Sequence, residues 1–320
     1  MATLVVPDSV PSPTEDSKTL MEACRGAGPD EKVFISILGH RNSSQRRNIR
    51  DTYQQLYNEP LTNCLYSELT DHFRRAIILW THDPAERDAI RANEVLKGRN
   101  PQLEVIVEIV CANSPHHLQT VKQAYCALFN SSLEKDIAAV VFSLHLRKLL
   151  LGLVGSFRYD KRVVDMQFAH WESADLFEAM QTKELGYDDL IYILSTRNAC
   201  QLKDSFKMYE QQFKLPIYED LKSYGGDDLT SLLKVAVQCI VCPEKHFAEV
   251  VNTSTRRLGM HDNDDDTLSG AIISRAEVDM ANVRTEYSNM FEANLDDDVA
   301  EHSFGDNTKS LIMTLLGAGV

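Results

Sequence analysis

The stretch Ile35–Tyr53 reads ISILGHRNSSQRRNIRDTY, and its pattern recurs three more times along the 320-residue chain. Each copy has an apolar triplet, a small polar break that often contains arginine, and a polar stretch that closes on tyrosine. The other copies are EIVCANSPHHLQTVKQAY, YILSTRNACQLKDSFKMY and IISRAEVDMANVRTEY, and the four closing tyrosines are Tyr53, Tyr125, Tyr209 and Tyr287. Because the intervals between these tyrosines are similar, the pattern indicates four repeats of similar length.

The apolar residues of these repeats have helical spacing. In VFISILGHR, Val33, Phe34, Ile37 and Leu38 fall on one face of a helix, at positions i, i+1, i+4 and i+5. Dense apolar runs follow each copy, such as AIILWTHDPAERDA from residue 76, and they are too long for single strands. Strand-like alternation is almost absent and hairpin dipeptides of the Asn-Gly type do not occur. The sequence therefore predicts an all-α fold with several short helices in each repeat.

Composition and charge narrow the function. A formal net charge of −14 argues against nucleic-acid binding through backbone phosphates, which needs a surface rich in Lys and Arg. Anionic membranes should also repel the chain unless something bridges the two negative surfaces. No apolar run is long enough to span a bilayer, and the start has neither the basic leader nor the apolar core of a signal peptide. Seven irregularly spaced cysteines favour a reducing compartment, and hence the cytoplasm, over a disulfide framework.

The chain resembles the annexin family in three features: the four copies at this spacing, the glycine loop RGAGPDE (25–31) and the phrase LWTHDPAERDA (79–89). It resembles the plant members of the family in its short N-terminal tail and in its middle repeats, which lack parts of the family pattern. The resemblance implies a curved disc of four repeats with about five helices each. It places a tail at 1–13 and repeats at 14–85, 86–157, 168–241 and 245–317. It also implies convex-face loops that bind Ca²⁺, through which anionic phospholipid is bound in turn. The resemblance also implies self-association on membranes and roles in stress responses and secretion.

The first repeat contains the family's calcium pattern, which is G-x-G-T with an acid at a fixed interval further along the chain. Gly26-Ala27-Gly28-Pro29 is followed by the segment 30–67 and then by Glu68, which is the interval that the family pattern requires. By this resemblance the carbonyls of Cys24, Gly26 and Gly28 and the carboxylate of Glu68 would hold Ca²⁺. The chemistry is suitable, because Ca²⁺ takes six to eight oxygen ligands at roughly 2.3–2.6 Å and glycines let carbonyls turn inward.

One position of this loop departs from the family pattern, since Pro29 replaces Thr. Proline is tolerated at a helix start, and the site needs carbonyls rather than an N–H, so little should be lost. An alternative interpretation is a plain capped helix start, with Asp30 and Glu31 facing the positive end of the helix dipole.

The other repeats depart further from the pattern. Repeat 4 has His302 where the acid is expected, and imidazole is a poor Ca²⁺ ligand. Its acidic run Asp262 to Asp266 lacks the glycine and the terminal Glu of an EF-hand loop, so a solvated acidic loop is the favoured interpretation. Repeat 2 has no acid in the loop AAVVFSLHLRKLL (138–150), and repeat 3 retains Asp220 as an isolated acid. We expect one good site and weaker membrane binding than in a member with several.

Two other classes of function remain open. The chain could be an annexin-fold scaffold whose calcium sites have decayed and which acts through protein partners. It could also have weak redox or peroxidase-like activity through His40 or through Cys111 and Cys239, but an isolated histidine at a helix end more often caps or packs. Cys239, Cys242 and His246 have metal-like spacing without a fourth ligand for structural zinc. No phosphate-binding glycine motif or catalytic triad is present, so the sequence favours a non-enzymatic membrane-binding protein.

Overall fold

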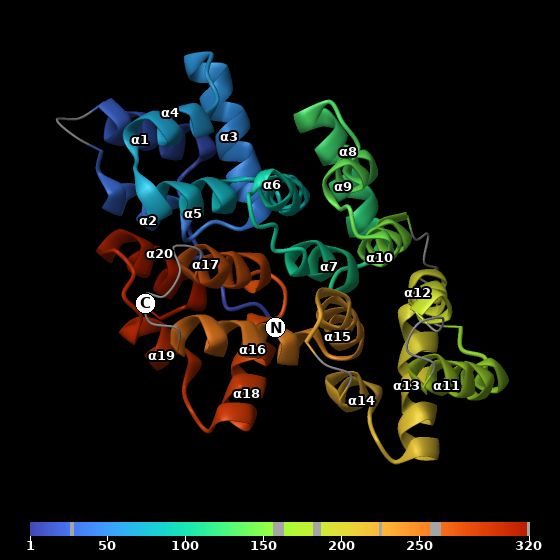
Figure 1. Cartoon of the computed structure of the whole chain (residues 1–320). Coiled ribbons are helices and arrows are strands. Elements are labelled where there is room, and N and C mark those ends of the chain that lie inside the picture. The colour runs from blue at the N-terminus through green and yellow to red at the C-terminus, as the bar shows by residue number, and fades with distance from the viewer. Residues whose placement is uncertain (26–28, 156–162, 182–186, 224–225, 257–263, 319–320) are drawn as a thin grey trace. The chain divides into compact units, whose positions relative to one another are not determined.

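A computed structural model describes the chain except for residues 26–28, 156–162, 182–186, 224–225, 257–263 and 319–320. The described part contains twenty α-helices and no β-strand (Figure 1). The prediction of an all-α fold is therefore confirmed.

The helices fall into four groups of five, and each group contains one copy of the tyrosine-closed pattern. The first ten helices are α1 (Pro13–Arg25), α2 (Glu31–Leu38), α3 (Ser43–Tyr57), α4 (Leu61–Glu68), α5 (Asp71–Thr81), α6 (Pro84–Lys97), α7 (Glu104–Cys111), α8 (Pro115–Phe129), α9 (Leu133–Val140) and α10 (Leu144–Gly155). The second ten are α11 (Met166–Gln181), α12 (Tyr187–Thr196), α13 (Ala199–Phe213), α14 (Ile217–Ser223), α15 (Asp228–Val241), α16 (Pro243–Arg256), α17 (Asp264–Arg275), α18 (Met280–Phe291), α19 (Leu295–Glu301) and α20 (Asp306–Leu316).

The third helix of each repeat shows how the recurring pattern forms structure. The apolar triplet ends the second helix, and the polar break starts the third. In repeat 1, the side chain of Asn42 accepts a hydrogen bond from the backbone N–H of Gln45, and the Gln45 side chain accepts one from that of Asn42. This reciprocal capping box satisfies two of the N–H groups that a helix start leaves without partners. The side chains of Ser114 and Asn198 likewise accept N–H bonds at the starts of α8 and α13.

The closing tyrosines are core residues. All four are completely buried, and Figure 1 shows the helices that carry them, α3, α8, α13 and α18. Each of these helices ends with a residue in the left-handed backbone region, five positions after its tyrosine. These residues are Asn58, Asn130, Lys214 and Glu292. The shared tyrosine and the shared ending explain why the closing part of the pattern recurs in all four repeats.

The chain divides into two compact units. The first combines Met1–Arg87 with Phe247–Val320, and the second is the continuous segment Asp88–His246. In the first unit, α2 and α5 of repeat 1 pack against α20, and α5 also packs against α17. In the second unit, α7 packs against α15, and α10 against α12. The first unit is thus built from the two ends of the sequence, which the order of the repeats does not indicate.

Candidate functional site

The predicted calcium loop of repeat 1 begins where α1 ends. Gly26 and Gly28 lie outside the described residues, so the structure places only their flanks. On one flank, Cys24 lies in the last turn of α1. On the other, Asp30 caps α2 by accepting a hydrogen bond from the Val33 N–H at 3.4 Å, and its own N–H donates to the Ala23 carbonyl at 3.2 Å. The carbonyl end of a helix carries partial negative charge, so the flank at Cys24 suits a cation.

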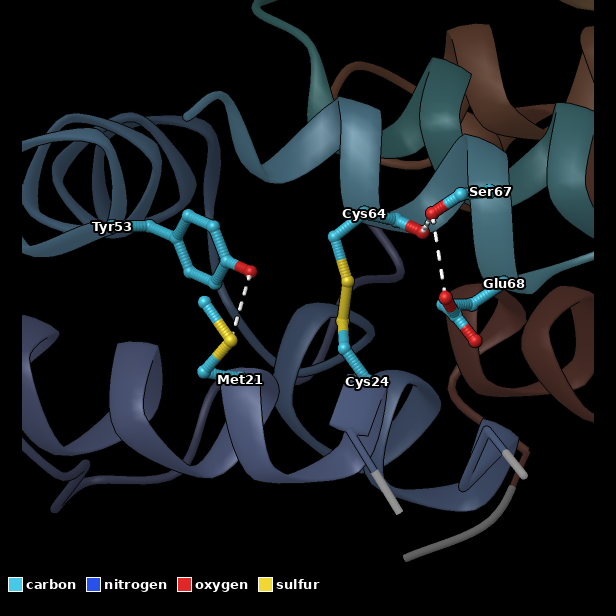
Figure 2. Close-up of a disulfide and its surroundings, with 6 residues drawn as sticks. All are labelled: Met21, Cys24, Tyr53, Cys64, Ser67 and Glu68. Carbon is cyan, nitrogen blue, oxygen red and sulfur yellow. Dashed lines mark hydrogen bonds between the residues drawn. A yellow bond between two sulfur atoms is a disulfide. The ribbon is translucent and has the colours of Figure 1, made fainter. Parts of the chain in front are cut away.

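Glu68 is the last residue of α4, and its side chain is exposed. Helix α4 packs against α1, and Cys64, four residues before Glu68, is bonded to Cys24 in the last turn of α1, so the two helix ends lie in the same part of the repeat. The hydroxyl of Ser67 lies 3.5 Å from one oxygen of the Glu68 carboxylate and donates to the Cys64 carbonyl at 3.0 Å. Figure 2 shows Cys64 and Glu68 extending from α4 toward the end of α1. A carboxylate and a helix-end carbonyl therefore lie on two neighbouring segments, as an oxygen-ligand site requires.

This donor set is compatible with Ca²⁺. Carbonyl and carboxylate oxygens are hard ligands, and an exposed carboxylate can reach an ion without first leaving a buried partner. Among the described residues, no group of three or more His, Cys, Asp or Glu side chains is arranged to hold a metal. A site made of backbone carbonyls with one carboxylate contains only one such side chain, so it would not form a group of that kind.

The cysteines at this site differ from the expectation. Cys24 and Cys64 form a disulfide with a Cα–Cα distance of 6.5 Å, and both side chains are buried (Figure 2). This one pair departs from the expectation that the cysteines reflect a reducing compartment and not a disulfide framework, while the other five cysteines, all within the described residues, remain thiols. The two residues are 40 positions apart in the sequence, and nothing in that spacing indicates that α1 and α4 bring them together.

At the position of Glu68, repeats 2 and 4 carry no carboxylate. Val140 ends α9, and Phe142 in the segment that follows is exposed. His302 follows α19, is 3% exposed and bonds through its Nε2 to Asp265 Oδ1 at 2.7 Å. The absence of a calcium ligand at these two positions in repeats 2 and 4 stays a prediction.

The structure tests the solvated-loop interpretation of the acidic run in repeat 4 only at the last residues of that run. Asp262 and Asn263 lie outside the described residues, but Asp265 and Asp266 are half-buried in the first turn of α17. Asp266 lies 3.0 Å from His72 Nδ1 and 3.5 Å from Arg75 Nη1. The hydrogen bond to Asp266 raises the pKa of His72 above its ordinary value. These two acids pair with basic side chains on α5 and at the end of α19.

Asp220 of repeat 3 also has a structural partner. It is buried and accepts a hydrogen bond from the hydroxyl of Tyr209. Asp136 and Asp298 accept the equivalent bonds from Tyr125 and Tyr287, and in all three repeats the Asp follows the Tyr by eleven positions. The interpretation of Asp220 as an isolated acid misses this pairing, although the same spacing occurs in three repeats of the sequence.

The residues considered for redox or metal chemistry lie in ordinary packing environments. His40 Nδ1 contacts the Ser36 carbonyl at 3.1 Å, one turn back at the end of α2, so its ring caps that helix. His246 Nε2 bonds to Glu108 Oε1 at 2.9 Å, and both side chains are buried. Cys111 and Cys239 are buried on α7 and α15, which pack together.

No helix in the described part of the chain combines the length and apolar character needed to cross a membrane.

Three segments, 15–80, 87–153 and 172–235, match the annexin family model. Annexin D3 of Arabidopsis thaliana is 46% identical over all of both chains, and annexin-like protein RJ4 of Fragaria ananassa is 38% identical over 99% of both. Among solved structures, annexin III superposes with a TM-score of 0.90 at 26% identity, covering 99% of this chain and 97% of its own. Chicken annexin V does so with a TM-score of 0.86 at 28% identity, covering 99% of each chain. The chain belongs to the annexin family, whose members are repeat proteins that bind calcium and phospholipid.

Proposed function

We propose that this annexin binds anionic phospholipid surfaces in a Ca²⁺-dependent manner, mainly through repeat 1. The observation that carries the proposal is Glu68, an exposed carboxylate at the end of α4, beside the end of α1. The carbonyls of Cys24, Gly26 and Gly28 would supply the other protein ligands, and a lipid phosphate or water would complete the shell.

Electrostatics explain why the ion is needed. A chain with a net charge of −14 and an anionic bilayer repel each other, so association requires a cation that both can coordinate. Ca²⁺ held by neutral carbonyls and one carboxylate retains positive charge for the lipid. The protein would be cytoplasmic without Ca²⁺ and peripheral to the membrane with it, and the bound form could self-associate on the surface.

The test is cosedimentation of the full chain with phosphatidylserine vesicles across a Ca²⁺ titration, with EGTA as control. Glu68→Gln removes the charge and one strong ligand, so we expect at least a tenfold rise in the Ca²⁺ concentration needed for binding. The matched control is Glu210→Gln, which neutralises an exposed carboxylate on α13 and should leave the titration unchanged.

An annexin scaffold without calcium function is the alternative, and it is favoured by Val140 and His302 at the positions equivalent to Glu68. It predicts no vesicle binding even at millimolar Ca²⁺. Binding that is Ca²⁺-dependent but equal in wild type and Glu68→Gln would instead move the site away from repeat 1.

A further inference from the structure

Repeat 1 lacks an interaction that the other three repeats share. In those repeats the buried tyrosine donates a hydrogen bond to an aspartate eleven positions later. The residue eleven positions after Tyr53 is Cys64. The hydroxyl of Tyr53 contacts Met21 Sδ at 3.6 Å instead (Figure 2). Cys64 therefore stands where the other repeats have a structural aspartate.

The partner of Cys64 is also specific to repeat 1. Leu96 in repeat 2 and Met180 in repeat 3 are the residues equivalent to Cys24, because each precedes the closing tyrosine of its repeat by the same interval. Leu96 and Met180 are both buried and apolar. In repeats 2 and 3 these two positions hold an apolar residue and an aspartate, whereas in repeat 1 both hold cysteine. The packing of α1 against α4 brings the two cysteines into a disulfide. Neither cysteine has a counterpart of its own kind in those repeats, so the pair is a joint feature of repeat 1.

The disulfide joins the two segments that carry the proposed calcium ligands. Cys24 is in the last turn of α1, directly before the predicted loop, and its own carbonyl is one of the predicted ligands. Cys64 precedes Glu68 by about one helical turn on α4. The covalent bridge therefore connects the start of the loop to the base of the helix end that presents the carboxylate (Figure 2).

We propose that Cys24 and Cys64 are a reversible redox switch that sets the calcium affinity of repeat 1. This inference rests on the proposed function. In the oxidising step, one cysteine thiolate attacks a small-molecule disulfide such as oxidised glutathione and releases one small thiol. The second cysteine then attacks the mixed disulfide and releases the other. Two protein thiols are oxidised to one disulfide, and one small disulfide is reduced to two thiols.

The physical effect is pre-organisation. In the oxidised form the bridge holds the end of α1 against α4, so the carbonyl and the carboxylate approach the ion with little remaining freedom. In the reduced form only side-chain packing holds these segments, and ion binding must also order them. Because that ordering opposes binding, oxidation should lower the Ca²⁺ concentration for half-maximal vesicle binding by roughly threefold to tenfold.

The experiment compares the full chain after treatment with oxidised glutathione and after reduction with a phosphine, each titrated with Ca²⁺ on phosphatidylserine vesicles. Peptide mass mapping without reductant reports whether Cys24 and Cys64 are linked. Cys64→Asp restores the residue of the other repeats and should fold, bind at the midpoint of the reduced wild type and no longer respond to oxidation. Cys126→Ser removes an exposed thiol on α8 and should keep the full redox response.

The outcomes separate the two proposals. Ca²⁺-dependent binding with equal midpoints in the oxidised and reduced proteins overturns the switch and leaves the proposed function in place. A redox response that persists in Cys64→Asp, or oxidation that leaves Cys24 and Cys64 unlinked, overturns it as well. Absence of Ca²⁺-dependent binding in both states overturns the proposed function, and the switch with it.

Discussion

At the scale of single residues, the buried tyrosines are the clearest shared feature of the repeats. Burial raises the pKa of Tyr125 and of Tyr287 to about 12, and the hydrogen bonds to their aspartates add to this effect. A hydroxyl in this environment stabilises the fold only because it has partners. For Tyr125 these are Asp136 Oδ2 at 2.7 Å and the amide nitrogen of Asn93 at 2.9 Å.

Tyr125→Phe should therefore lower the free energy of unfolding by about 1–2 kcal/mol, because it removes two hydrogen bonds, one of them from the buried side chain of Asn93. Tyr53→Phe is the matched comparison. Its hydroxyl meets the weak acceptor Met21 Sδ at 3.6 Å, so the loss should be about 0.5 kcal/mol or less. Urea denaturation of both variants measures the difference, and equal losses would contradict the role assigned to Asp136.

Sequence reasoning identifies the tyrosines but not their partners. The tyrosines recur within a recognisable phrase, whereas the aspartates lie eleven positions later in stretches that otherwise differ. Listing the residue at that offset in each repeat would reveal Asp136, Asp220 and Asp298, with Cys64 as the exception. Its pairing with Cys24 could not be found this way, because it depends on how α1 packs against α4.

Glu86 provides a prediction about pH. Burial by itself would raise its pKa, but hydrogen bonds from His82 and Arg50 outweigh burial and lower the pKa to about 2. A carboxyl with a lowered pKa in the folded state stabilises the protein above its unfolded value of 4.5, and this stabilisation is lost as the pH falls toward 2. Glu86→Gln should be less stable than wild type at pH 7, and the gap should shrink steadily as the pH falls from the unfolded value toward the folded one. A gap that stays constant over that range, measured by urea denaturation, would show that the charge does not carry the effect.

At the scale of helices, the ends of the third helices show where the backbone is strained. Asn58 and Asn130 tolerate the left-handed region, but Glu292 has a φ of 53° and places a negative charge at the carbonyl end of α18. Glu292→Gly should raise the free energy of unfolding by about 0.5–1 kcal/mol, because glycine relieves the strain. Glu292→Ala removes the same charge and keeps the strain, so thermal denaturation should show a smaller gain or none.

The helical character of the chain was predictable, but some roles of the helices were not. Helical spacing of apolar residues is a local property, so the all-α fold follows from short windows of sequence. The acidic run near Asp265 and Asp266 has the polar composition of a solvated loop. Asp265 and Asp266 lie in the first turn of α17 and pair with His302 and His72, which are distant in sequence. Pairings between residues that are distant in sequence cannot be predicted from the local composition of either segment.

At the scale of the whole molecule, an ion pair between a buried arginine and a half-buried glutamate joins the two chain segments of the first unit. Arg46 on α3 donates to Glu277, which follows α17, with Nη2 to Oε2 at 2.7 Å. Its guanidinium also stacks over Trp80 at 3.7 Å from the ring centre. Burial lowers the pKa of Arg46, and Glu277 counteracts that effect. The charge of this arginine is therefore tolerated because a residue 231 positions later neutralises it.

Glu277→Gln should accordingly destabilise the first unit by about 3–5 kcal/mol, since it leaves a buried positive charge without its partner. Limited proteolysis at increasing urea should cleave Met1–Arg87 and Phe247–Val320 before Asp88–His246 in this variant. Arg284 and Asp296 form a more exposed pair in the same unit, so Asp296→Asn is the matched control and should cost about 1 kcal/mol or less. Similar losses in both variants would contradict the importance assigned to burial.

The divided first unit has a consequence for synthesis on the ribosome. Repeat 1 emerges first, but α2 and α5 need α17 and α20, which are made last, and the backbone at Thr3 bonds to Ala276. The contacts of Asp88–His246 lie within one continuous stretch, so this segment can fold as soon as it has been synthesised. During that time the N-terminal segment keeps apolar surface exposed to solvent, because its partner helices have not yet been made. We expect the earliest part of this chain to reach its final structure last, and to be the part that depends most on chaperones while translation continues.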